Sequence, residues 1–118
     1  MVMNLSDEEL ARGVATHSSG NHGGALAAIA EIRGIRATVV MPENASRVKV
    51  NAVREYGAEI QFCASNTLSR EACLEGVLAE TGAVFVPPYN AYRIIAGQAT
   101  VILEFIEQVG GLHTVVAP

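Results

Sequence analysis

The sequence is short of the residues that mark several classes of protein. Its 118 residues contain no tryptophan and one lysine, Lys49, and only 17% of them are charged. With a formal net charge of −4 and no basic cluster, the chain lacks the positive surface that binds nucleic acid. No apolar run reaches the roughly 20 residues that span a bilayer, so no membrane partner is expected. No group of histidine, cysteine or carboxylate residues has the spacing of a metal site.

Cysteine is equally scarce, and its placement bears on the cellular compartment. Cys63 and Cys73 are not spaced as a CxxC pair, so a redox or metal role is disfavoured. We expect reduced, partly buried thiols of a cytoplasmic protein. The stretch from Met1 to Glu9 turns acidic at once, and we therefore expect no signal peptide.

Apolar runs and helical patterns alternate along the chain. Half of the residues are hydrophobic, which is enough for a buried core, and the length suits one domain. Glycine or proline ends most of the segments. Strands are expected over residues 14–16, 37–41, 58–63, 83–86 and 113–116. Helices are expected between Ser6 and Gly13, over 25–32 and 46–56, from a cap at Thr67 or Ser69 to Gly82, and over 92–109.

This alternation predicts an α/β fold: a three-layer βα-repeat whose parallel sheet is covered by helices through right-handed crossovers. We expect residues 1–118 to form a single small domain, with 110–118 as the start of a strand that would belong to a further, larger domain. In the helix over 46–56, Val48 and Tyr56 are expected on the buried face, and Lys49 is expected in solvent.

The most informative stretch is Thr-His-Ser-Ser-Gly-Asn-His-Gly at residues 16–23. It follows an apolar run and precedes an alanine-rich helical pattern, so it reads as a loop between a strand and a helix start. Backbone N–H groups at a helix start lack partners, and the helix dipole adds partial positive charge there. Such a loop suits a carboxylate or a phosphate. The plain alternative is a polar turn that leads into a buried helix.

The same stretch resembles the substrate and cofactor loop of fold-type II pyridoxal-phosphate enzymes, within the serine racemase and serine/threonine ammonia-lyase (threonine dehydratase) group. Further stretches are similar in the same order, so that the resemblance covers nearly the whole chain. They include Val40-Met41-Pro42-Glu43-Asn44-Ala45, Tyr56-Gly57-Ala58-Glu59, Ser69-Arg70-Glu71, Pro88-Tyr89-Asn90 and Arg93-Ile94-Ile95-Ala96-Gly97-Gln98.

The resemblance implies roles for particular residues. The substrate carboxylate would be bound by Ser18, Ser19, Asn21 and His22, with Gly20 allowing its close approach. Asn21 would also hydrogen-bond the phenolic oxygen of pyridoxal 5'-phosphate. Ser19 matches the residue that works as the acid and base in racemases of the group, and Arg70 matches an arginine that can reach the substrate carboxylate. The implied reaction removes the α-proton of a small hydroxy amino acid and, in the lyases, eliminates its β-hydroxyl to give ammonia and a 2-keto acid.

The sequence also departs from the family pattern. The family's Schiff-base lysine lies in a Ser-Phe-Lys or Ser-Tyr-Lys context that does not occur here, and Lys49 matches a different position. The glycine-rich loop for the cofactor phosphate is also absent from the 118 residues. We therefore expect a fragment that is inactive alone. The alternatives are a non-catalytic module that binds a small anion or amino acid, and one half of a split enzyme. A homodimer is a possible assembly in each case.

Overall fold

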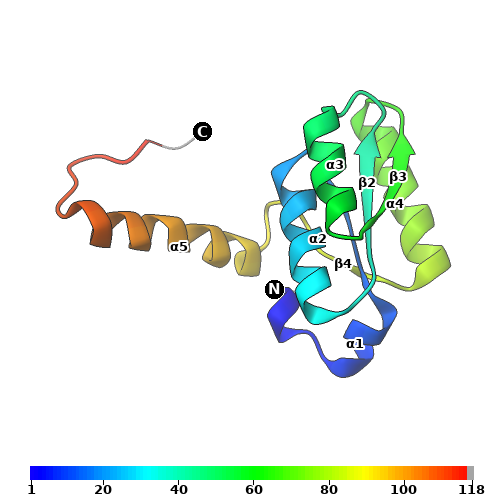
Figure 1. Ribbon diagram of the computed structural model, residues 1–118, viewed down its shortest axis with the longest axis horizontal. Coiled ribbons are helices and arrows are strands. Elements are labelled where there is room, and N and C mark those ends of the chain that lie inside the picture. The colour runs from blue at the N-terminus through cyan, green and yellow to red at the C-terminus, as the bar shows by residue number, and fades with distance from the viewer. Residues whose placement is uncertain (117–118) are drawn as a thin grey trace. The chain divides into compact units, whose positions relative to one another are not determined.

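The computed structural model describes residues 1–116 and divides the chain into two compact units, Met1–Pro88 and Tyr89–Pro118. The first unit holds a parallel sheet with four strands, β1 (Val14–His17), β2 (Ala37–Pro42), β3 (Glu59–Cys63) and β4 (Val84–Phe85). Their order across the sheet is β3-β2-β1-β4 (Figure 1). This confirms the predicted α/β class with its parallel sheet.

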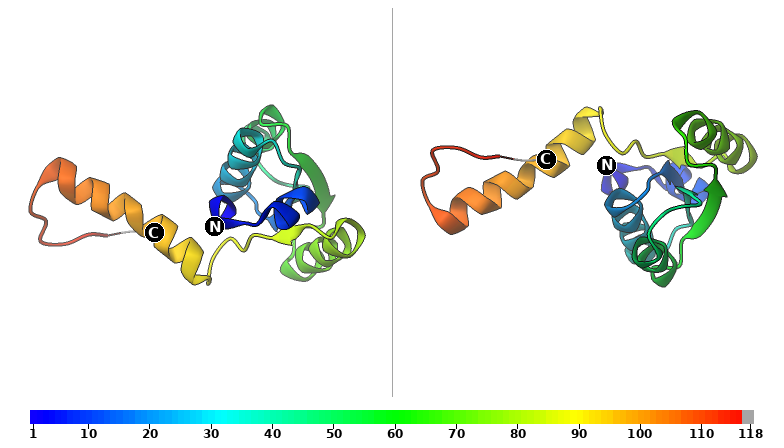
Figure 2. Two further views of the ribbon diagram at one scale, coloured as in Figure 1. Left: turned by 90° about the horizontal axis from the view of Figure 1, so that it is seen from below. Right: turned by 90° about the horizontal axis from the view of Figure 1, so that it is seen from above.

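The handedness of the crossovers explains which helix covers which face. The chain steps from β1 to β2 to β3 in one direction, through α2 (Asn21–Arg33) and α3 (Arg47–Glu55). It then returns through α4 (Thr67–Thr81) to β4 on the other side of β1. Because right-handed crossovers in opposite directions lie on opposite faces, α2 and α3 share one face and α4 covers the other (Figure 2).

The core lies where these helices meet the two central strands. Val39, Val40 and Met41 of β2 and Ala15 of β1 are fully buried. From α4, Leu74 packs against Ala15 and Val40. Central strands that are apolar on both faces, as here, are typical of a parallel sheet covered on both sides.

The ends of the elements follow local chemistry. A short helix, α1 (Asp7–Arg12), begins with the capping box of Ser6 and Glu9 and ends at Gly13, whose φ is +81°. A 3-10 turn, η1 (Val2–Asn4), precedes it. The cap of α4 differs from expectation, because the Asn66 side chain accepts the Ser69 N–H at 2.8 Å. An amide oxygen one residue earlier replaces the expected hydroxyls of Thr67 or Ser69.

Two expectations about buried surfaces are corrected. Val48 is 77% exposed and Tyr56 is 42% exposed, whereas Val50 and Val53 of the same helix are buried. Only a narrow stripe of α3 faces the sheet, since α2 and β3 are the elements it packs against.

The second unit consists of α5 (Tyr92–Val109) followed by residues without regular structure. The helix has the predicted bounds. The expected strand over 113–116 does not form, because a strand needs a neighbour for its backbone hydrogen bonds and this segment has none among residues 1–116. The last two residues of the expected segment 110–118 lie outside the described residues. Within the described range, no helix combines the length and apolar character needed to cross a membrane.

Candidate functional site

The loop of residues 18–20 lies at the point where the direction of the chain through the sheet reverses. β1 has β2 on one side and β4 on the other, and the connection to α2 leaves from the carboxyl end of β1. In open parallel sheets, ligands bind beyond the carboxyl ends of the strands at such a point. The predicted site residues Ser18 to His22 are therefore at the edge where a ligand site is expected.

The loop is held to the sheet by its first residue. The Ser18 N–H donates to the Val40 carbonyl at 2.9 Å, which continues the β1–β2 pairing by one residue. The Ser18 side chain is buried, and its Oγ accepts the Gly20 N–H at 3.1 Å. The Ser18 Oγ thus stabilises the turn as an acceptor and keeps its O–H as a donor, while the Ser18 backbone fixes the loop to β2.

The start of α2 is uncapped. The N-cap residue is Gly20, which has no side chain to accept a hydrogen bond from the first turn, and no acidic residue lies in that turn. The first intrahelical bond runs from Gly24 N–H to the Gly20 carbonyl, which leaves the N–H groups of residues 21–23 without partners within residues 1–116. These free donors and the helix dipole are the features on which the predicted anion site depends.

Close packing of α2 on the sheet sets the position of this helix start. A Cβ on Gly23 would lie 2.8 Å from Cγ1 of Val39 and 3.3 Å from Cβ of Ser18. A Cβ on Gly24 would meet nothing within 4 Å. Gly23 is therefore the residue that brings the helix against β2 and the loop.

Two polar side chains of the loop face solvent. Ser19 and Asn21 are exposed, and neither side chain hydrogen-bonds another residue among the 116 described. An unpartnered hydroxyl and an unpartnered amide beside three free N–H groups form a set of donors for an oxygen-rich ligand.

His22 is half-buried and connects the first turn of α2 to the segment that follows β4. Its Nε2 lies 3.3 Å from the Val86 carbonyl, directly after β4. Donation from Nε2–H leaves Nδ1 as the ring's acceptor in the neutral imidazole. His22 therefore links the start of α2 to the segment that follows β4, a structural role that its sequence position alone does not reveal.

Arg70 lies in the first turns of α4, on the opposite face of the sheet from α2. Its guanidinium donates to Thr67 Oγ1 at 3.4 Å and makes no hydrogen bond to the loop within the described residues. In addition to burial, the positive charge of Arg70 affects the pKa of His17, the last residue of β1. Burial, followed by the positive charge of Arg70, lowers the pKa of His17 below its ordinary value of 6.5. His17 also stacks on Phe85, with ring centroids 6.2 Å apart.

The pH dependence of stability follows from His17. Because the pKa of His17 is lower in the folded chain, the unfolded chain takes up this proton first as pH falls through 6.5. We expect the free energy of unfolding to fall between about pH 7.5 and about pH 5.5, and the fall to be shallower in His17→Gln. Urea unfolding at several pH values measures both slopes, with exposed His113→Gln as control. Equal slopes for wild type and His17→Gln would contradict the assignment.

Lys49 is exposed, as the sequence predicts, and its side chain lies against the loop. A Cβ built on Gly20 would be 2.6 Å from Lys49 Nζ and 2.9 Å from its Cδ. Gly20 has φ −170°, which any residue can adopt, so space and not backbone conformation makes glycine necessary here. Two features of the sequence single out Lys49: it is the only lysine, and it lies in the first turn of the helix that follows β2.

The residues present fit the substrate side of a pyridoxal-phosphate site better than the cofactor side. The free amide of Asn21 fits a hydrogen bond to the phenolic oxygen of the cofactor. The single amine, Lys49, extends from α3 onto Gly20 and does not match the position of the family's Schiff-base lysine.

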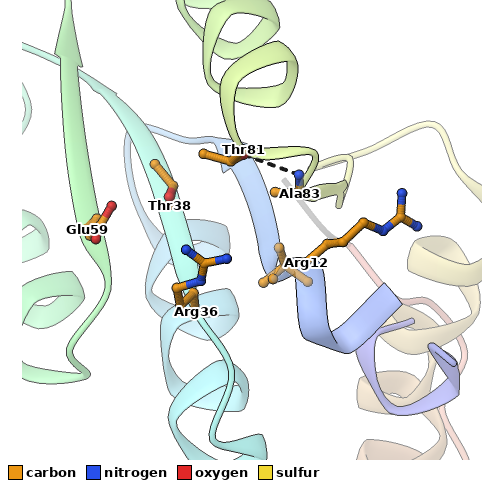
Figure 3. Close-up of a pocket in the computed structure, with 8 residues that line it drawn as sticks. Arg12, Arg36, Thr38, Glu59, Thr81 and Ala83 are labelled. Atoms are coloured by element: carbon orange, nitrogen blue, oxygen red, sulfur yellow. Dashed lines mark hydrogen bonds between the residues drawn. The ribbon is translucent and has the colours of Figure 1, made fainter. Parts of the chain in front are cut away.

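Other features of the described residues offer less chemistry. A pocket of about 30 Å³ between Arg12, Arg36, Thr38 and Thr81 lies at the amino ends of the strands, at the opposite edge from the loop (Figure 3). Burial raises the pKa of the Cys63 thiol, and its Sγ lies 3.5 Å from the Met41 carbonyl. Both cysteines are free. Residues 1–116 contain no group of three histidine, cysteine or acidic side chains that could hold a metal ion.

Comparison with known proteins identifies the family of the chain. The family model described as pyridoxal-phosphate dependent enzyme matches residues 1–118. The chain is 52% identical over 117 residues to the beta-hydroxyaspartate dehydratase of Paracoccus denitrificans, covering 99% of this chain and 37% of the relative. It is 44% identical to the serine racemase of Arabidopsis thaliana, covering 99% of this chain and 35% of the relative.

Solved structures show the same relationship. The structure of maize serine racemase matches with a TM-score of 0.84 and 48% sequence identity, over 89% of this chain and 32% of the racemase chain. The chain thus spans about a third of the length of the proteins it matches. Sequence and fold together show that the chain belongs to the family of pyridoxal-phosphate dependent enzymes.

Proposed function

We propose that these residues are the substrate-binding part of a pyridoxal-phosphate dependent ammonia-lyase (dehydratase) or racemase that acts on a small hydroxy amino acid. The observation that carries the proposal is the uncapped start of α2, where three free N–H groups lie beside the unpartnered side chains of Ser19 and Asn21. The names of relatives support the substrate class, since they include serine racemases and dehydratases of hydroxyaspartate and threonine.

Each residue of the loop has a task in this proposal. Ser18, Ser19, Asn21 and His22 bind the substrate carboxylate through their side chains and the free N–H groups at the start of α2, and Gly20 allows its close approach. Ser19 also moves the proton of the α-carbon, and Asn21 also hydrogen-bonds the phenolic oxygen of the cofactor. Arg70, which matches an arginine of the family, reaches the carboxylate when this small domain closes on the substrate. The bound cofactor supplies an electron sink for the charge that develops at the α-carbon.

The remaining parts of the site are proposed to lie outside these residues. A larger domain, to which residues 110–118 would contribute the start of a strand, would supply the Schiff-base lysine and the phosphate loop. The alternative is a second chain that supplies them, in a split enzyme. The two free thiols support a reducing, cytoplasmic compartment.

The test is binding of L-serine to the 118-residue chain. Serine is expected to shift the amide signals of residues 21–23 in a two-dimensional NMR spectrum. Asn21→Ala is expected to weaken binding by about two- to tenfold, since one hydrogen bond is lost. Asn44→Ala, which removes an exposed amide from another loop, should leave binding unchanged. A titration that leaves residues 21–23 unshifted would overturn the proposal.

A turnover assay separates binding from catalysis. With pyridoxal 5'-phosphate and L-serine, the chain alone is expected to form no 2-keto acid, because its single lysine does not match the Schiff-base position. Production of keto acid would show that the 118 residues suffice for catalysis. It would refute the proposal that the Schiff-base lysine and the phosphate loop lie outside these residues.

A further inference from the structure

The loop and the helix that follows β2 place an unused positive charge beside the carboxylate site. α3 begins at the carboxyl edge of the sheet, the edge from which the 18–20 loop also leaves. Lys49 lies in its first turn, and its side chain passes over Gly20 with Nζ in the space a Cβ would take. The Lys49 side chain can occupy this space because residue 20 has no side chain.

The Lys49 ammonium is without a partner. It makes no hydrogen bond or ion pair with any of residues 1–116. The acidic residue of the preceding loop, Glu43, is exposed and does not pair with it. Lys49 is exposed, so the three N–H donors of its ammonium face solvent and are available to a ligand.

The position is also electrostatically unfavourable without an anion. A cation in the first turn of a helix opposes the helix dipole. The first turns of α2 and α3 both lack acidic residues, so the two positive helix ends and Lys49 are not neutralised locally. A carboxylate between the start of α2 and Nζ would satisfy the free N–H groups and the ammonium together.

We propose that Lys49 is a substrate-binding residue, whose ammonium and the first turn of α2 hold the same substrate carboxylate. The inference rests on the proposed function and assigns a second, charged donor to it. Gly20 is then needed to let Lys49 reach the site.

The sole lysine makes a direct test possible. Labelling lysine at Cε with ¹³C gives one side-chain signal in the full 118-residue chain, and L-serine is the probe. We expect the Lys49 signal to shift during the titration with the same apparent Kd as the amides of residues 21–23. Lys49→Gln is expected to weaken binding about 10- to 100-fold, as for the loss of a charged hydrogen bond, and to flatten its salt dependence.

Two variants act as controls, and a third tests whether Lys49 needs the open space beside Gly20. Arg54→Gln removes a positive charge from the last turn of the same helix, at the other edge of the sheet, and should leave Kd within about twofold. Lys49→Arg keeps the charge and should retain part of the affinity. Gly20→Ala should displace the ammonium and resemble Lys49→Gln in affinity, because Nζ is the flexible end of the contact.

The outcomes separate this inference from the proposed function. If serine shifts residues 21–23 while the Lys49 signal stays still and Lys49→Gln binds as wild type, the loop binds carboxylate and the role of Lys49 is wrong. If serine shifts neither set of signals, the proposed function fails and the inference fails with it.

Discussion

Gly23→Ala is expected to lower the free energy of unfolding of the chain by about 1–2 kcal/mol. The added Cβ would lie 2.8 Å from Val39 Cγ1, inside the contact distance of real side chains. Val39 of β2 is fully buried with its Cγ1 against α2, so it has little room to move. Overpacking of this kind costs about 1–3 kcal/mol, which exceeds the roughly 0.5–1 kcal/mol that alanine gains over glycine inside a helix.

The neighbouring glycine is a matched control. Gly24→Ala adds the same methyl group one residue later, where nothing lies within 4 Å. It is expected to raise the free energy of unfolding by about 0.5–1 kcal/mol through helix propensity alone. Urea unfolding measures both variants, and equal effects would refute the packing argument.

The same Gly23→Ala substitution is also expected to change the geometry of the binding loop. The added Cβ would also lie 3.3 Å from Ser18 Cβ, so relief of the clash moves the helix start or the loop. The N–H groups of residues 21–23 would then shift relative to Ser19. We expect Gly23→Ala to weaken L-serine binding, whereas Gly24→Ala leaves it unchanged.

Met41→Ala is expected to destabilise the chain most, by about 2–5 kcal/mol. Met41 is the largest of the fully buried side chains and lies near the carboxyl end of β2. Truncation loses its transfer free energy and leaves a cavity that the packed helices cannot close. Such a loss is a large fraction of the about 5–15 kcal/mol that stabilises an ordinary domain.

The control for Met41 is an apolar residue that the tertiary structure leaves in solvent. Val48, expected on the buried face of its helix, is 77% exposed. Val48→Ala should change the free energy of unfolding by no more than about 0.5 kcal/mol. Chemical denaturation of both variants gives the comparison, and a Val48→Ala effect as large as that of Met41→Ala would mean that α3 packs through the other face.

Features that depend on neighbours along the chain could be predicted from the sequence. The alternation of apolar runs and helical patterns predicts a parallel α/β sheet, because that arrangement covers both faces of apolar strands. The Ser6–Glu9 capping box forms as predicted, since both partners lie within one helical turn. The bounds of α5, Tyr92–Val109, are also as predicted, because the helical pattern and the glycines that follow it are local features of the sequence. The motif at 16–23 likewise predicts a loop between a strand and a helix start, and in the structure β1 ends at His17 and α2 begins at Asn21.

Features that depend on distant residues were decided by the tertiary structure. The strand over 113–116 fails to form although its residues favour it, because strand formation needs a pairing partner. Lys49 reaches Gly20, and His22 reaches Val86, because the right-handed crossovers bring α2, α3 and the end of β4 to one edge of the sheet. Residue types alone thus determine the chemistry that the loop offers. Which side chains join it is decided by packing between segments far apart in the sequence.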